Sequence, residues 1–174
     1  LRIEEVELAE PGPGEVLVRL VACGVCHTDL HPIKGDIPVP LPIVLGHEGA
    51  GVVERRGPGV TSLQEGDHVV LSVLPWCGRC PACHQGKPYL CQVGWQRMFA
   101  GTMMDGTRRL RFPDGREINH FFCQSSFAQY AVVDERSAVK VRRDAPLDKL
   151  ALLGCGVTTG VGTVVNTARV EAGS

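Results

Sequence analysis

The sequence predicts a mostly β, barrel-like domain with short helices and a helical segment at its C-terminal end. Short runs rich in β-branched residues recur along the chain, each bounded by glycine or proline. Glycine (21 residues) and proline (12) are frequent, whereas aromatic residues make up only 5%. Helical periodicity appears only after residue 146. A chain of 174 residues is long enough for one such domain with a buried core.

Each expected element follows from its local pattern. Strands are expected at residues 3–8, 15–22, 51–56, 67–74, 126–133 and 137–141. Helical patterns cover residues 147–153 and 158–168. Residues 28–31 predict a short helical turn capped by Thr28. Residues 75–125 hold five cysteines, both tryptophans and little periodicity, which indicates a large excursion that needs a covalent or metal staple.

Charge and hydropathy exclude several classes of protein. Eighteen Lys and Arg against 19 Asp and Glu give a net charge of −1, which leaves no basic excess for nucleic-acid binding. No apolar run approaches the roughly 18 residues that a membrane span needs. The chain starts at Leu1 without a signal peptide, so we expect a cytoplasmic protein. Both ends resemble cuts, and we expect a piece of a longer protein.

Four of the eight cysteines predict a structural metal site. Cys77, Cys80, Cys83 and Cys91 are separated by two, two and seven residues. Four thiolates in this order can surround one zinc ion as a closed tetrahedron. The alternative of an iron–sulfur cluster fits the spacing poorly, because bacterial clusters use a shorter last gap followed by proline. Disulfides or free thiols remain as a further alternative.

Three other short motifs carry possible chemistry. Residues 23–27 read CGVCH, which is typical of c-type haem attachment or of a thioredoxin motif, but the β-rich context supports neither. His47 and Glu48 lie in a glycine-rich segment that is not the HExxH of zinc proteases. Cys155 lies between two glycines, and too few residues follow it for a dinucleotide-binding unit. Cys23 and Cys123 are expected to be buried small residues.

Read together in order, these motifs resemble the N-terminal catalytic domain of zinc-dependent medium-chain alcohol dehydrogenases. The resemblance covers nearly the whole chain and includes the four-cysteine loop. It implies a GroES-like, partly open barrel over residues 1–153, with the structural-zinc loop at about 75–95. It also implies that residues 154–174 lead into an α/β Rossmann nucleotide-binding domain, which this sequence does not contain.

The resemblance assigns a second zinc ion and its surroundings. It implies that Cys26, His47 and Cys155 bind a catalytic zinc, with Glu48 behind the metal as an occasional ligand. Asp29 resembles the carboxylate that orients a ligating histidine. A purely structural role is the alternative for these ligands.

The resemblance also assigns the residues that meet the substrate and the cofactor. Thr28 resembles the hydroxyl that takes the alcohol proton, and His31 the base that ends the proton relay. A plain surface histidine is the alternative for His31. His27 resembles a residue near the cofactor pyrophosphate, and Thr159 a contact on the nicotinamide side. We expect NAD to bind only in the full-length parent and the isolated chain to be inactive.

The function implied is the reversible oxidation of a primary or aromatic alcohol to the aldehyde, with hydride transfer to NAD. Residues 38–42 and 120–128 are similar to the aryl-alcohol branch, whereas residues 154–174 are equally similar to the glutathione-dependent formaldehyde dehydrogenase branch. Phe121, Phe122 and Trp76 line either an apolar pocket or the core. A zinc-stapled binding module without catalysis is the alternative from another class. We expect a small-molecule partner, no nucleic acid, no membrane, and a homodimer or homotetramer of the parent.

Overall fold

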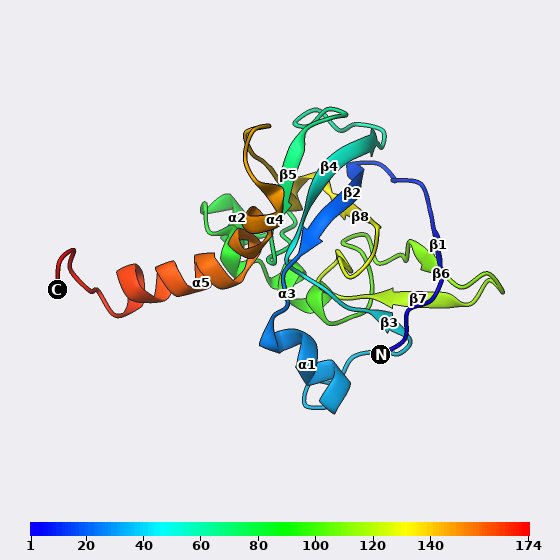
Figure 1. Ribbon diagram of the computed structural model, residues 1–174, viewed down its shortest axis with the longest axis horizontal. Helices are drawn as coiled ribbons and strands as arrows, with labels where there is room; N and C mark the ends of the chain where they lie inside the picture. The colour runs from blue at the N-terminus through cyan, green and yellow to red at the C-terminus, as the bar shows by residue number, and fades with distance from the viewer.

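A computed structural model describes residues 1–174 and shows two β-sheets with short helices around them (Figure 1). The larger sheet has five strands in the order β8-β2-β4-β5-β9, and the smaller has four in the order β1-β6-β7-β3. The strands are β1 (Glu7–Leu8), β2 (Glu15–Cys23), β3 (Ile43–Val44), β4 (Gly49–Arg56), β5 (His68–Leu71), β6 (Leu110–Arg111), β7 (Glu117–His120), β8 (Tyr130–Asp134) and β9 (Ala138–Lys140). The mostly β fold with short helices predicted from the sequence is confirmed.

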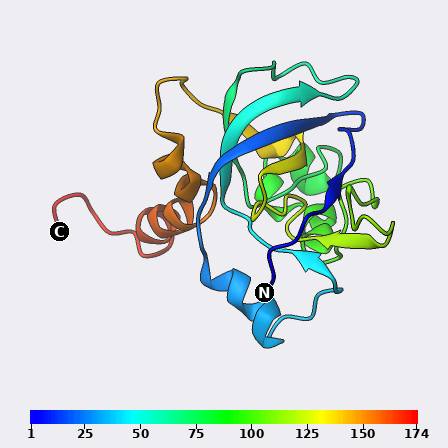
Figure 2. The same ribbon diagram turned by 45° about the vertical axis from the view of Figure 1, so that its right-hand side comes forward.

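The helices are short. Three of the α-helices fall between strands along the chain, and two follow the last strand. The α-helices are α1 (His27–Lys34), α2 (Pro81–His84), α3 (Gln92–Met98), α4 (Leu147–Leu150) and α5 (Gly156–Gly162). Three 3-10 turns are η1 (Pro88–Leu90), η2 (Glu135–Ser137) and η3 (Ala151–Gly154), and η4 (Thr163–Thr167) is a π-helical continuation of α5. In both views α5 projects away from the sheets toward the C-terminus (Figures 1 and 2).

The main core lies under the larger sheet and is built from β-branched side chains. The strand β2 pairs antiparallel with β4 on one side and with β8 on the other. Val16, Val18, Val53, Val69 and Val133 are almost fully buried in this core. Because strand residues alternate between the two faces, the valine-rich runs of these strands place one face on the core. This packing fixes the strand ends from which the site residues extend.

Several expected elements are shorter than the sequence pattern indicated. Of residues 3–8 only Glu7–Leu8 form a strand, and the strand expected at 126–133 begins only at Tyr130. The expected cap is wrong: α1 begins after Cys26, and Thr28 lies inside the helix. The strands near residues 15–22, 51–56 and 137–141 are confirmed, as are the C-terminal helices.

No single helix is long and apolar enough to cross a membrane. The segments Leu147–Gly154 and Gly156–Thr167 meet at a bend of 53°, and only together do they reach the length and apolar composition of a membrane span. Core helices of globular proteins can have the same length and apolar composition.

A buried histidine holds the smaller sheet to the loop before it. Nε2 of His120 accepts a hydrogen bond from the backbone N–H of Arg109 at 2.9 Å. On the other side of the ring, Nδ1 lies 3.4 Å from the Ser125 hydroxyl. Burial lowers the pKa of His120 to about 4, and the charges of Arg109 and Arg108 act in the same direction. The neutral imidazole is therefore the form that the fold stabilises.

We expect this histidine to make the fold sensitive to acid. In the unfolded chain its pKa is about 6.5, so its contribution is fully present above that pH. It is lost as the pH falls from about 6.5 to about 4, at a cost on the order of 3 kcal/mol. Urea unfolding at a series of pH values measures this. The control is His120→Gln, which offers an acceptor without titrating, and an equal slope for both proteins in this window would contradict the prediction.

Candidate metal centres

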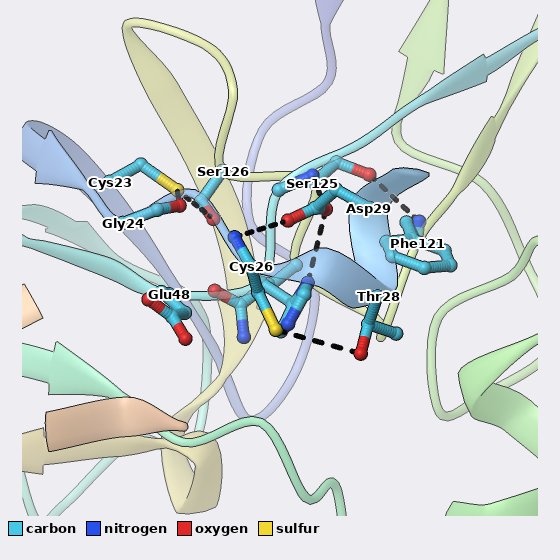
Figure 3. Close-up of polar contacts among 12 residues, drawn as sticks. Cys23, Gly24, Cys26, Thr28, Asp29, Glu48, Phe121, Ser125 and Ser126 are labelled. Atoms are coloured by element: carbon cyan, nitrogen blue, oxygen red, sulfur yellow. Dashed lines mark hydrogen bonds and ion pairs between the residues drawn. The ribbon is translucent and has the colours of Figure 1, made fainter. Parts of the chain in front are cut away.

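Asp29 is the fixed point of the first candidate site. Its carboxylate is 2% exposed and accepts hydrogen bonds from the N–H of Cys26 at 3.2 Å and the N–H of Gly46 at 3.0 Å. The same carboxylate lies 3.1 Å from Nδ1 of His47. Figure 3 shows the backbone nitrogen of Cys26 in contact with Asp29 and its sulfur in contact with Thr28. A buried carboxylate at Nδ1 holds the proton on that nitrogen, so the lone pair of His47 is on Nε2.

His47 Nε2 is the observation that points to a metal ion. This atom is completely buried and has no hydrogen-bond partner. A buried acceptor without a partner is costly, so it requires an explanation. The ligand atoms of Cys26, His47, Glu48 and Cys155 all lie within 4.8 Å of one another. Two sulfurs, an imidazole nitrogen and a carboxylate are donors that zinc accepts, so the residues fit the expected zinc ion.

The charges at this site also favour a bound cation. Burial raises the pKa of Cys26, but hydrogen bonding with Thr28 and the charge of His47 outweigh it, so this pKa lies below its ordinary value. Burial, together with the charges of Cys26 and Glu48, raises the pKa of Cys155 to about 12. Burial would lower the pKa of His47, but Asp29 outweighs it and the pKa is raised. The thiols of Cys26 and Cys155 and the carboxyl group of Glu48 therefore lie close together. A divalent cation relieves the repulsion between their charged forms.

Glycines let the segments of this site approach one another. A Cβ on Gly24 would lie 2.0 Å from Glu48 Oε2, and one on Gly154 would lie 2.2 Å from the carbonyl oxygen of Leu71. Glu48 Oε1 accepts a hydrogen bond from the N–H of Gly156 at 3.1 Å. The glycines thus permit the close packing that brings Glu48 and Cys155 beside Cys26.

Two phenylalanine rings pack against the ring of His47. The ring of Phe122 stacks on it with centroids 4.8 Å apart, and Phe121 meets it edge-on at 5.7 Å. Both phenylalanines are almost fully buried, whereas Trp76 lies apart beside Arg136. Of the two alternatives left open by the sequence, Phe121 and Phe122 follow the core one, and Trp76 belongs to neither. Sequence reasoning did not find the stacking of Phe122, because it depends on a left-handed backbone at this residue (φ 54°).

The second candidate site is the four-cysteine loop. The four sulfurs lie within 4.8 Å of one another, with Cys80 at 3.5 Å from Cys83 and at 3.8 Å from Cys91. A tetrahedral zinc ion with bonds of about 2.3 Å places its sulfurs about 3.8 Å apart. The sulfur of Cys91 also accepts N–H groups from Cys77 and Gly94, both at 3.3 Å. The geometry of the loop thus fits zinc, and all eight cysteines are free thiols.

The cysteines of this loop differ in acidity. The backbone amide of Cys83 lowers the pKa of Cys80 to about 6. Partial burial and the neighbouring Cys80 sulfur raise the pKa of Cys83 to about 11. Four thiolates at this separation repel one another, so a cation is needed before all four can be deprotonated.

The remaining predicted site residues lie on two helices around the first site. The Thr28 hydroxyl is 3.5 Å from the Cys26 sulfur (Figure 3). His31 is partly exposed on α1, with Nδ1 3.1 Å from Asp36 and its ring edge-on to His27 at 5.1 Å. His27 is exposed, and Thr159 is exposed on α5, one turn beyond Cys155. The structure brings Thr28 to the metal ligands, while the roles of His27, His31 and Thr159 stay predictions.

A two-sheet β domain with a Cys–His–Cys donor set and a separate four-cysteine loop is the arrangement of zinc-dependent medium-chain alcohol dehydrogenases. The family described as alcohol dehydrogenase GroES-like domain matches residues 12–143, and the chain belongs to it.

Two curated relatives are almost half identical to this chain. The class-3 alcohol dehydrogenase of Drosophila melanogaster is 48% identical and the S-(hydroxymethyl)glutathione dehydrogenase of Paracoccus denitrificans is 47% identical, each over 175 residues. Both alignments cover all of this chain but only 46% and 47% of the relatives. The chain therefore spans about half the length of the curated relatives it matches.

Two solved structures are also similar. An alcohol dehydrogenase zinc-binding domain protein from Burkholderia ambifaria has a TM-score of 0.93 at 48% identity, over 99% of this chain and 47% of that one. Benzyl alcohol dehydrogenase from Acinetobacter calcoaceticus has a TM-score of 0.86 at 46% identity, over 95% of this chain and 44% of that one.

Proposed function

We propose that the chain is the catalytic domain of an NAD-linked, zinc-dependent alcohol dehydrogenase. The observation that carries this proposal is the unpartnered Nε2 of His47, which lies among the sulfurs of Cys26 and Cys155 and beside Glu48. Family membership supports the same reaction class. Because the chain covers less than half of its relatives, we propose residues 1–153 as the catalytic domain and 154–174 as the start of a connection to a nucleotide-binding domain.

The residues of the site divide the work of the reaction. Cys26, His47 and Cys155 would hold zinc, which when bound supplies a Lewis acid that lowers the pKa of the alcohol hydroxyl. Asp29 keeps the proton on Nδ1 of His47 and fixes the orientation of its ring. The Thr28 hydroxyl, next to the Cys26 sulfur, is placed to accept the proton of the alcohol.

The proton must then reach solvent. His31 is partly exposed on the same helix as Thr28 and hydrogen-bonds with Asp36, which suits a terminal base. His27 and Thr159 are exposed at the two helices that border the site, and we propose that they contact NAD.

Two relatives with nearly the same sequence identity to this chain support two different substrate classes. We propose a primary or aromatic alcohol, supported by the 46% identity to a benzyl alcohol dehydrogenase. S-(hydroxymethyl)glutathione is the second candidate, supported by the 47% identity to a dehydrogenase of that name. Turnover of benzyl alcohol and of S-(hydroxymethyl)glutathione by the full-length enzyme separates the two, because a charged tripeptide and an apolar ring require different pockets.

Location and assembly are further proposals. Eight cysteines without a disulfide support a reducing compartment such as the cytoplasm. A homodimer or homotetramer of the full-length enzyme follows from the family resemblance, and sedimentation measures it.

Metal analysis tests the central proposal. We expect about two zinc ions for each chain, because the structure offers two separate donor sets. His47→Ala should remove one ion and leave the ion of the four-cysteine loop. Iron in place of zinc, or a single ion in the unsubstituted chain, would contradict the proposal.

Substitutions on α1 test the order of the proton relay. In the full-length enzyme, Thr28→Ala should lower kcat by about 10²- to 10⁴-fold, because Thr28 would touch the reacting oxygen. His31→Gln should lower kcat much less and be rescued by high buffer concentration, since solvent bases replace a terminal base. Equal losses that buffer does not rescue would count against this order.

A further inference from the structure

The four-cysteine loop is attached to the larger sheet at one corner, between β8 and β9. The side chain of Arg136 in η2 donates from Nη1 to the carbonyl oxygen of Cys77 at 2.6 Å. In the opposite direction, Nε1 of Trp76 donates to the carbonyl oxygen of Arg136 at 3.2 Å. The guanidinium also lies over the Trp76 ring, 5.7 Å from its centroid. Three contacts thus connect one residue of the corner to the first two residues of the loop.

The Arg136 guanidinium is held in place from its other edge. Nε and Nη2 donate to the two oxygens of Asp134 at 2.8 and 2.5 Å, which is a bidentate pair. Asp134 is only 13% exposed in its side chain, and it also accepts the backbone N–H of Arg136. A planar guanidinium with two edges occupied has little rotamer freedom left. Arg136 can therefore fix the Cys77 carbonyl.

Space beside the guanidinium is kept by a glycine. Gly78 follows Cys77 with φ 73°, a left-handed conformation that suits glycine. A Cβ at this position would lie 3.1 Å from Nη1 of Arg136. The backbone of the loop thus leaves room for Arg136 at the point where the loop turns toward Cys80.

These contacts act on the first metal ligand. The N–H of Cys77 donates to the sulfur of Cys91, and its carbonyl accepts from Arg136. The peptide groups on both sides of the Cys77 Cα are therefore fixed, one inside the metal site and one outside it. A ligand whose backbone is held in advance loses less entropy when the metal binds.

We propose that Arg136 is a positioning residue of the four-cysteine metal site, which orients Cys77 through its backbone and so slows metal loss. This rests on the proposed function, in which the loop binds zinc. Partners outside the ligand shell typically change metal affinity by about 10- to 100-fold. The same range is expected here for the rate of metal loss.

Zinc release from the loaded chain to a colorimetric chelator tests the proposal. We compare the unsubstituted chain with Arg136→Ala, Arg136→Lys and a matched control, Arg142→Ala. Arg142 makes the same kind of bidentate pair with Asp144, two residues away, but it is exposed and its side chain makes no hydrogen bond to the loop. Alkylation of cysteines during release identifies which site is emptied.

Arg136→Ala should release one of the two ions about 10- to 100-fold faster, with alkylation appearing first at Cys77 to Cys91. Arg136→Lys should be intermediate, because lysine can donate to the Cys77 carbonyl but cannot bind Asp134 with a fork. Arg142→Ala should behave like the unsubstituted chain. In the cobalt-loaded chain, the sulfur-to-metal absorption of the four-thiolate site should weaken in Arg136→Ala at limiting cobalt.

Two results would overturn the proposal. One is equal release from Arg136→Ala and the unsubstituted chain. The other is faster release from both metal sites alike, because that would reflect general loosening of the fold. A loop that binds no metal in the unsubstituted chain would instead refute the proposed zinc site itself, so the two failures are distinguishable.

Discussion

Cys91→Ser should remove the zinc ion of the four-cysteine loop and expose residues 75–100 to proteolysis. Cys91 is the most buried of the four ligands, and its sulfur accepts two backbone N–H groups. Structural zinc contributes about 10–16 kcal/mol in zinc-finger peptides. Losing even part of this is large beside the roughly 5–15 kcal/mol that stabilises a whole domain.

The choice of serine isolates the metal from the local helix. Cys91 caps α3 by accepting the N–H of Gly94, and serine is a good residue for the same cap. The helix start is therefore retained, and the effect reports the lost ligand. Limited proteolysis and zinc analysis measure it.

Cys123→Ser is the matched control for Cys91→Ser. Cys123 is equally buried, and burial raises its pKa to about 12, but it belongs to neither metal site. A buried hydroxyl in its place should cost about 1–3 kcal/mol and leave both ions bound. If Cys91→Ser kept two zinc ions, or if Cys123→Ser lost one, the assignment of the loop would be wrong.

Gly154→Ala should weaken zinc binding at the other site by about 10- to 100-fold and lower the free energy of unfolding by about 1–3 kcal/mol. The added Cβ would lie 2.2 Å from the carbonyl oxygen of Leu71, a fully buried residue at the end of β5. A backbone carbonyl in a sheet cannot rotate away as a side chain would. The segment around Gly154 must therefore shift, and Cys155, the next residue, shifts with it.

A hydrogen bond also connects Gly154 to the chain just after β5. The N–H of Val73 donates to the carbonyl oxygen of Gly154 at 3.1 Å, so the shift breaks or strains this bond as well. Chelator competition and thermal unfolding measure the two effects. Gly160→Ala on α5 is the control, because no atom lies within 4 Å of its added Cβ. The control should be as stable as the unsubstituted chain or more so, since alanine favours helix by about 1 kcal/mol. Equal zinc affinity in both variants would contradict the prediction.

The larger sheet was predictable from the sequence, whereas of the smaller sheet only β1 was expected. The strands β2 and β4 are long runs of β-branched residues, so their pattern is visible locally. By contrast β3 and β6 have two residues each, too few to show alternation. The strand β3 also pairs in parallel with β7, which is far away in the sequence. Such pairing depends on the assembled fold and leaves no local signal.

The two metal sites differ in the same way. The spacing of Cys77, Cys80, Cys83 and Cys91 is local, so the donor set is visible in the sequence. The grouping of Cys26, His47 and Cys155 followed only from a family resemblance, because no spacing rule connects residues so far apart. Arg136 gave no sequence signal, because its contact with Cys77 exists only after β8 and β9 have formed.

The distribution of ligands along the chain implies an order in which the ions are acquired during synthesis. The four cysteines of the loop are all available once Cys91 has left the ribosome, and closing so short a loop costs little entropy. The other site requires Cys155, which emerges much later and must join Cys26 and His47 after the sheet has formed. Since chains are made from the N-terminus, the nascent protein can carry its first zinc ion well before the second donor set is complete.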